Sequence, residues 1–114
     1  MQAQQSEIFT EIFVSTDCLK TEEIALKYGA KVVRRPVELA GATSPDIEWV
    51  LHALHIWQKE EKEFDAFAIL RPTSPFRRPE TIRMAWQYFQ SQQVADSLRA
   101  VEKVKQHPGK MWVI

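Results

Sequence analysis

The residue types best suited to chemistry lie in residues 70–78, which read Leu-Arg-Pro-Thr-Ser-Pro-Phe-Arg-Arg. Within this stretch, two hydroxyl groups and three guanidinium groups stand beside two prolines. Guanidinium groups bind carboxylates and phosphates, and each proline fixes its own φ and restricts the residue before it. The stretch therefore predicts a stiff, cationic turn that could face an anionic small molecule.

Two predicted elements position this turn. Residues 65–70 form an apolar run that predicts a strand, and Pro79 suits the first position of a helix over residues 79–92. In an open parallel α/β sheet, ligands bind outside the carboxyl ends of the strands. We therefore expect a central strand to deliver the turn to a ligand-binding edge.

The rest of the chain alternates short apolar runs with helical patterns. Further strands are predicted over residues 11–15, 31–34 and 96–104, and further helices over 20–28 and 46–62. Strands separated by helices predict βαβ units and a mostly parallel sheet, so the fold class is α/β. A strand close to the first residue and an apolar run at the last residues predict a sheet that is incomplete at both ends.

Composition limits the possible partners. Fifteen Lys and Arg balance fifteen Asp and Glu, so nucleic acid is not expected as a partner. No apolar run reaches the roughly 18 residues that a transmembrane helix needs, so no membrane span is expected. Cys18 is the single cysteine, which excludes an internal disulfide, and we expect it to be a small, half-buried residue of a cytoplasmic protein.

Five short blocks follow one another at residues 14–17, 28–30, 35–40, 70–77 and 107–112. They read Val-Ser-Thr-Asp, Tyr-Gly-Ala, Arg-Pro-Val-Glu-Leu-Ala, Leu-Arg-Pro-Thr-Ser-Pro-Phe-Arg and His-Pro-Gly-Lys-Met-Trp. Together they resemble the acylneuraminate cytidylyltransferase family, to which the CMP-sialic acid synthetases belong. The resemblance implies a Rossmann-like, three-layer nucleotidyltransferase fold of the GT-A-like type. It also implies a reaction in which an acidic, sialic acid-like sugar attacks the α-phosphate of CTP, assisted by Mg²⁺, to give a CMP-sugar and pyrophosphate.

The same resemblance implies substrate-binding roles for a set of polar and cationic residues, namely Arg35, Thr43, Arg71, Thr73, Ser74 and Arg77. Arg35 would help to hold the nucleotide, and Thr43 lies in a small polar segment near the base. Arg71 stands where sialic acid synthetases carry a glutamine that contacts the sugar, and a cation there suits a sugar carboxylate. Ala42 departs from the acidic residue that the family pattern leads us to expect.

Residues 1–114 are expected to be the central part of a cytidylyltransferase domain. The glycine-, lysine- and arginine-containing loop that cradles the triphosphate in the family is not found before Ile8, and no catalytic or metal-binding residue is assigned in this chain. We therefore expect the isolated chain to be inactive. Exposed apolar faces should make it self-associate, as a homodimer or otherwise.

Other interpretations stay open on the sequence alone. The arginines could be surface charges, and Thr73 and Ser74 could cap the following helix. Glu48, His52 and His55 share a helix face, so they could ligate a metal or form a solvated edge. The four tryptophans are expected in the core or at an interface. A non-catalytic nucleotide- or sugar-binding module and a plain interaction domain are the alternative functions.

Overall fold

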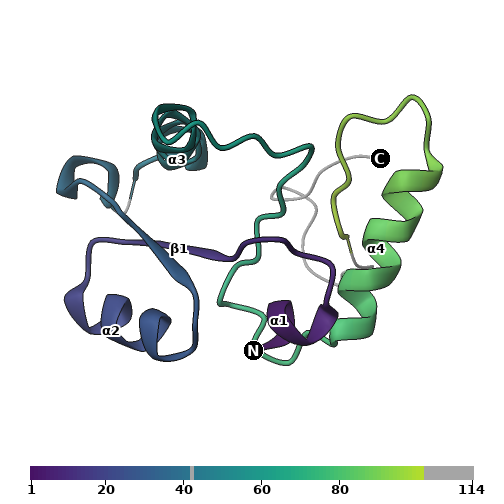
Figure 1. Cartoon of the computed structure of the whole chain (residues 1–114), viewed down its shortest axis with the longest axis horizontal. Helices are drawn as coiled ribbons and strands as arrows, with labels where there is room; N and C mark the ends of the chain where they lie inside the picture. Colours follow the sequence, from purple (N-terminus) through teal and green to yellow (C-terminus); the bar gives the residue numbers. More distant parts are fainter. Residues whose placement is uncertain (42, 102–114) are drawn as a thin grey trace, which may run out of the picture.

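A computed structural model describes residues 1–41 and 43–101 (Figure 1). Its helices are α1 (Gln2–Ser6), α2 (Leu19–Lys27), α3 (Asp46–Lys59) and α4 (Pro79–Ser91), with a short 3-10 helix, η1, at Val37–Leu39. The strands in this part of the chain are β1 (Phe13–Thr16) and β2 (Lys31–Arg34). Within the same residues, every helix falls short of the length and apolar character needed to cross a bilayer.

β1, α2 and β2 form a β-α-β unit. The two strands are parallel, and their register pairs Phe13 with Lys31 and Thr16 with Arg34. Gly29 follows α2 with φ +76°, a conformation that glycine adopts without a Cβ clash, and it turns the chain back towards β2. The predicted βαβ unit and the predicted parallel pairing are confirmed.

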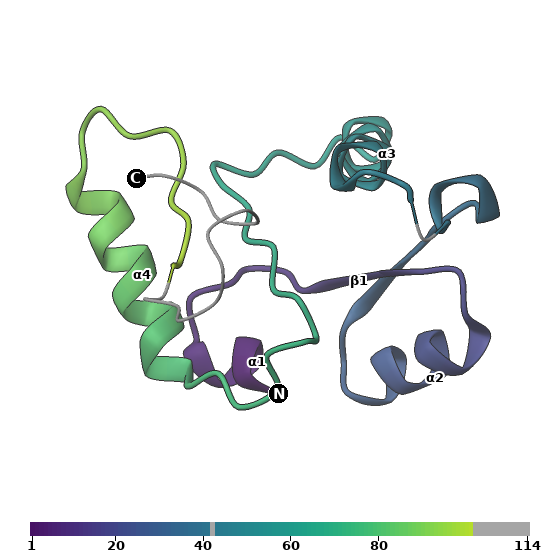
Figure 2. The ribbon, with the colours of Figure 1, turned by 180° about the vertical axis from the view of Figure 1, so that it is seen from behind.

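Helices cover both faces of the strand pair, with α2 on one side and α3 on the other (Figures 1 and 2). On the α3 side, the centroid of the Phe13 ring lies 4.9 Å from that of Trp57 and 6.1 Å from that of Phe64. The next residue of β1, Val14, lines a hollow of about 440 Å³ together with Ala25 of α2. Successive strand side chains point to opposite faces, so one strand contacts both helical layers. This helix-sheet-helix arrangement agrees with the predicted Rossmann-like α/β class.

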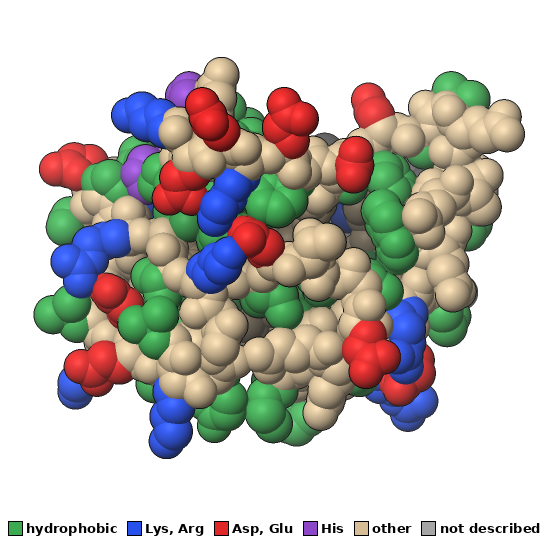
Figure 3. Space-filling view, in the orientation of Figure 1, with side chains coloured by type: hydrophobic (Ala, Val, Ile, Leu, Met, Phe, Trp, Pro, Cys, Tyr) green, Lys and Arg blue, Asp and Glu red, His purple; other side chains and the backbone are tan. Residues whose placement is uncertain are grey.

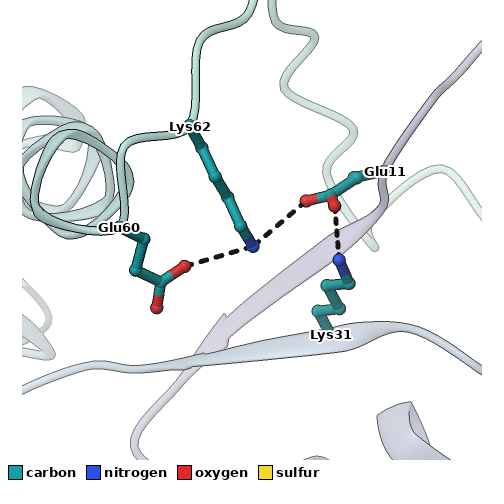
Figure 4. A network of polar contacts seen from close by, with 4 residues as sticks. All are labelled: Glu11, Lys31, Glu60 and Lys62. Atoms are coloured by element: carbon teal, nitrogen blue, oxygen red, sulfur yellow. Dashed lines mark hydrogen bonds and ion pairs between the residues drawn. The ribbon is translucent and has the colours of Figure 1, made fainter.

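Four charged side chains, those of Glu11, Lys31, Glu60 and Lys62, form a polar network (Figure 4). It lies beside the aromatic cluster of Phe13, Trp57 and Phe64, because both lysines lie near the Phe13 ring. The carboxylate of Glu11 accepts hydrogen bonds from Lys31 and from Lys62, the latter over 3.4 Å, and Lys62 also donates to Glu60 over 3.1 Å. The hydrogen bond from Lys31 lowers the pKa of Glu11, and the hydrogen bond to Glu60 raises the pKa of Lys62. Lys62 Nζ also lies 5.2 Å from the centroid of the Phe13 ring. These contacts tie the beginnings of both strands to the segment that leaves α3.

α1 packs against α4, beside the β-α-β unit (Figure 2). Ile82 of α4 is buried, and Ser6 at the end of α1 is only 1% exposed. The Ser6 hydroxyl donates to the carbonyl of Ala3 over 2.6 Å, which satisfies this buried polar group. The Gln4 side-chain amide donates to the carbonyl of Tyr28, so α1 also contacts the chain at the end of α2.

Two predicted strands are not formed in the described residues. Residues 65–70 were expected to form the central strand, yet in the part of the chain that is described β1 pairs with β2 alone. Phe67 and Ile69 of this run are 56% and 45% exposed. An apolar run becomes a strand only where a neighbouring backbone completes its hydrogen bonds, and no described residue does so here.

The second strand prediction, over residues 96–104, is wrong for residues 96–101 for the same reason. The remainder of that prediction lies outside the described residues, as do the 107–112 block and the apolar run at the end of the chain.

Apolar side chains reach the surface between charged groups on the face shown in Figure 3. Among the exposed apolar residues of the described chain are Leu19 of α2 and Met84 of α4, with 63% and 65% of their area exposed. The buried apolar residues of the described chain are few and mostly small, namely Ala25, Val33, Ala53 and Ile82. Because this core is small, the half-buried aromatic cluster becomes important for packing.

Candidate functional site

The turn between Leu70 and α4 is a pair of consecutive tight turns. The backbone N–H of Ser74 donates to the carbonyl of Arg71 over 3.4 Å, and that of Arg77 donates to the carbonyl of Ser74 over 3.3 Å. Thr73 is exposed like Ser74, and neither hydroxyl caps α4, because Arg78 is the N-cap residue and no side chain completes the cap. The helix-capping alternative is therefore wrong, and both residues are exposed.

Arg71 contacts the first residue of α3. Its Nη2 atom pairs with Oδ2 of Asp46, and the indole Nε1–H of Trp49 donates to the other carboxylate oxygen, Oδ1, over 3.2 Å. Asp46 and Trp49 are three residues apart on a helix, so their side chains share one face. The helix dipole also favours a carboxylate in the first turn. Local helix geometry thus presents Asp46 to Arg71.

Arg35, the residue after β2, is held against the carboxyl end of β1. Its backbone N–H donates to the carbonyl of Thr16 over 2.8 Å, which extends the strand pairing by one bond. Its side chain donates from Nε to the hydroxyl of Ser15 over 3.2 Å and from Nη2 to the Ser15 carbonyl over 3.1 Å. The guanidinium carbon lies 5.2 Å from the centroid of the Trp49 ring, a cation–π distance. Three contacts therefore fix the direction of this side chain.

Two of the predicted site residues are thus connected through residues that were not themselves predicted as site residues. We name this set the Asp46 network, and it consists of Ser15, Arg35, Asp46, Trp49 and Arg71. Trp49 was expected in the core or at an interface, yet its ring faces a cation and its N–H meets a carboxylate. The sequence signal for this arrangement was an aspartate three residues before a tryptophan at a helix start. Such a pair usually indicates only a contact within the helix itself.

The other predicted site residues are not members of this network. Thr43 is exposed, and no hydrogen bond within the described residues joins it to the Asp46 network. Its neighbour Ser44 donates from its hydroxyl to the carbonyl of Glu38 over 3.4 Å, which closes the corner before α3. The structure therefore places Thr43 on an exposed corner before α3.

Ser74 and Arg77 line a second hollow of about 310 Å³, which they share with Arg71. The opposite wall is formed by residues 1–3 together with Ile82. The side-chain amide of Gln2 donates to the carbonyl of Pro75, so α1 lies directly on the turn. Arg71 accordingly lines this hollow and also belongs to the Asp46 network.

The chain matches the family model described as Cytidylyltransferase over residues 1–108. It belongs to the cytidylyltransferase family. The CMP-N,N'-diacetyllegionaminic acid synthase of Legionella pneumophila is 45% identical over 84 residues, which are 73% of this chain and 36% of that protein. The N-acylneuraminate cytidylyltransferase of Escherichia coli is 39% identical over 89 residues, which are 78% of this chain and 20% of that protein.

The pseudaminic acid cytidylyltransferase of Campylobacter jejuni is 31% identical over 88 residues, covering 76% of this chain and 38% of that protein. The chain therefore spans between a fifth and two fifths of the length of these curated relatives. The family prediction made from the five blocks is confirmed.

Cys18 is the N-cap residue of α2, and it is exposed. The backbone N–H of Thr21 hydrogen-bonds to its thiol and lowers the pKa of Cys18. The expectation of a half-buried cysteine was wrong, because the residue lies at a helix start on the surface.

Proposed function

We propose that this chain is the central part of a nucleotidyltransferase that couples CTP to an acidic, sialic acid-like sugar and releases pyrophosphate. One observation carries the proposal. The Asp46 network joins Arg35, at the carboxyl end of the β-α-β unit, to Arg71, in the turn before α4. Ligands of parallel α/β sheets bind at this edge, and guanidinium groups suit phosphates and carboxylates. The family membership and the names of the relatives support the reaction class.

The proposed chemistry is displacement at phosphorus, where catalysis depends mainly on positioning and charge neutralisation. Arg35, held by Ser15, would meet the negative charge of the nucleotide. Arg71 would meet the carboxylate of the sugar. Thr73 and Ser74, which are exposed, would hydrogen-bond to sugar hydroxyl groups. Arg77 would add positive charge on the same side, and Thr43 would lie near the base.

Magnesium would neutralise phosphate charge in such a reaction. Within residues 1–41 and 43–101, no group of three or more His, Cys, Asp and Glu could hold a metal ion. Glu48, His52 and His55, which share a helix face, are included in that result. The carboxylate of the site, Asp46, already contacts Arg71 and Trp49. The roles proposed for this chain therefore involve its guanidinium and hydroxyl groups.

A chimera provides the sharpest test. The segment of the E. coli N-acylneuraminate cytidylyltransferase that aligns with this chain would be replaced by the matching residues of this chain. We expect the chimera to release pyrophosphate from CTP in the presence of Mg²⁺ and an acidic sugar, and we expect the 114-residue chain alone to release none. The sugars to compare are acylneuraminates, legionaminates and pseudaminates. A folded chimera that releases no pyrophosphate with any of them would contradict the proposal.

A non-catalytic nucleotide- or sugar-binding module is the second candidate. This function is favoured by the contacts of Asp46 with Arg71 and Trp49, because they leave the Asp46 network without a free carboxylate that could act as a base. A module of this kind would bind CTP or the sugar in calorimetric titrations, yet its chimera would not turn over. Binding and turnover measured on the same preparation therefore separate the two functions.

The proposal includes a cytoplasmic location and self-association, with neither nucleic acid nor membrane as a partner. Exposed apolar side chains on α2, such as Leu19 and Leu26 at 63% and 57%, support association between copies. Light scattering after gel filtration would report the mass of the species. A monomer at all concentrations would contradict this part of the proposal.

A further inference from the structure

Asp46 makes two contacts that a simple helix-start residue does not need. Its Oδ2 atom pairs with Arg71, which comes from a turn 25 residues further along the chain, and its Oδ1 atom accepts the Trp49 indole N–H over 3.2 Å. The Trp49 ring in turn lies 5.2 Å from the Arg35 guanidinium carbon. Two of the three arginines of the candidate site, Arg35 and Arg71, are therefore connected to one carboxylate.

We propose that Asp46 is a positioning residue that sets the directions of Arg35 and Arg71 together. It acts on Arg71 directly and on Arg35 through the plane of the Trp49 ring. The importance of this for ligand binding rests on the proposed function, whereas the effect on the two side chains does not. Because a guanidinium group binds bidentately only within a narrow range of orientations, fixing its direction matters for recognition.

The positions of the partners favour this role over a purely structural one. The side chains of Arg71 and Asp46 are 61% and 48% exposed, so their ion pair contributes little to folding. Arg35 already has two hydrogen bonds to Ser15, so Trp49 is not needed to satisfy it. What the network adds is a fixed relation between two side chains that come from different loops.

Three substitutions separate the two arms of the network, which are the ion pair between Asp46 and Arg71 and the hydrogen bond from Trp49 to Asp46. Asp46→Asn keeps the oxygen that accepts from Trp49 and removes the charge that pairs with Arg71. Asp46→Ala removes both arms, and Trp49→Phe keeps a ring beside Arg35 but loses the indole donor. Glu48→Gln is the matched control, since Glu48 is the other acidic residue of the same first turn and contacts neither arginine among the described residues.

The first measurement is ¹⁵N NMR of the Trp49 indole and Arg35 Nε–H signals in the 114-residue chain, with far-UV circular dichroism to confirm folding. Asp46→Ala should shift both signals, and Asp46→Asn should leave the indole signal near its original position. Trp49→Phe should shift the Arg35 signal, and Glu48→Gln should move neither. Unchanged Trp49 and Arg35 signals in a folded Asp46→Ala variant would overturn the proposal, and this result does not depend on any ligand.

The second measurement is the affinity for CTP and for N-acetylneuraminate by calorimetry. Loss of one exposed charge pair should weaken N-acetylneuraminate binding by up to about fivefold in Asp46→Asn. Loss of both arms should weaken binding of both ligands by about five- to tenfold in Asp46→Ala. Tighter binding of the sugar by Asp46→Asn would show that Asp46 competes with the ligand, and it would also overturn the proposal. If the unsubstituted chain binds neither ligand, the proposed function fails for this chain and the NMR signals alone decide the role of Asp46.

Discussion

Replacing Phe13 by alanine tests whether the aromatic cluster attaches α3 to the strand pair. The Phe13 ring centroid lies 4.9 Å from Trp57 and 6.1 Å from Phe64, and Lys62 Nζ lies 5.2 Å from it. Each ring pair contributes about 0.5–1.5 kcal/mol beyond its buried area. A fully buried Phe→Ala change costs about 3–5 kcal/mol, so for the half-buried Phe13 we expect a loss of about 2–3 kcal/mol in the free energy of unfolding.

Urea unfolding, followed by tryptophan fluorescence and circular dichroism, measures this loss. For a denaturant dependence of about 1–2 kcal/mol per molar urea, the midpoint should fall by about 1–3 M. Phe76 is the matched control, because at 95% exposure its replacement by alanine should cost less than about 0.5 kcal/mol. Phe13→Leu should lie between the two and stays measurable if the alanine variant does not fold. Equal midpoints for Phe13→Ala and Phe76→Ala would refute the role given to the cluster.

Three further predictions use matched pairs or a pH series. Glu11→Gln should reduce stability only at pH values where Glu11 is ionised. Because the pKa of Glu11 is lowered in the fold, the stability advantage of the wild type is complete above the ordinary value of 4.5 and disappears as pH falls through the lower folded-state pKa. The thermal unfolding midpoints of the two proteins should therefore converge in acid. Arg35→Lys should weaken CTP binding by about tenfold, because a lysine cannot reproduce the guanidinium contacts. Arg34→Lys is the control: it changes a residue paired with a glutamate of α2 and should alter the CTP affinity by less than about twofold in the same titration. Ile82→Ala should lower the free energy of unfolding by about 2–4 kcal/mol in urea, because Ile82 is buried beside α1. Met84→Ala, on the exposed side of the same helix, should lower it by less than about 0.5 kcal/mol. Equal losses would contradict the α1–α4 packing.

Local patterns were sufficient to predict the β-α-β unit and the helix starts. The strand predicted at 31–34 matches β2, and the helices predicted from Asp46 and Pro79 begin at those residues. These features depend on neighbours in sequence: apolar spacing, a glycine after α2, and a proline at a helix start. The end of α3 was placed three residues too late, at Lys62 instead of Lys59, because helix ends depend on where the chain must turn.

Features that depend on distant partners could not be predicted in the same way. The run at 65–70 has the composition of a buried strand, but pairing needs a second backbone, and the described residues do not supply one. The motif blocks identified Arg35 and Arg71 without indicating that they are connected. The link passes through Asp46 and Trp49, whose spacing looks like ordinary helix-start chemistry, so only the three-dimensional arrangement shows it.

The placement of Asp46 explains how one carboxylate can orient two arginines at little cost in free energy. A carboxylate at the beginning of α3 also interacts favourably with the helix dipole. The ion pair with Arg71 is exposed and contributes at most about 1 kcal/mol, so a ligand carboxylate could share or reorganise it without unfolding the site. Arg35, in contrast, is anchored by the hydroxyl and the carbonyl of Ser15 at the end of β1. Arg35 is therefore held by the strand end and Arg71 by one exposed ion pair, and under the proposed function these two side chains would face the nucleotide and the sugar carboxylate, respectively.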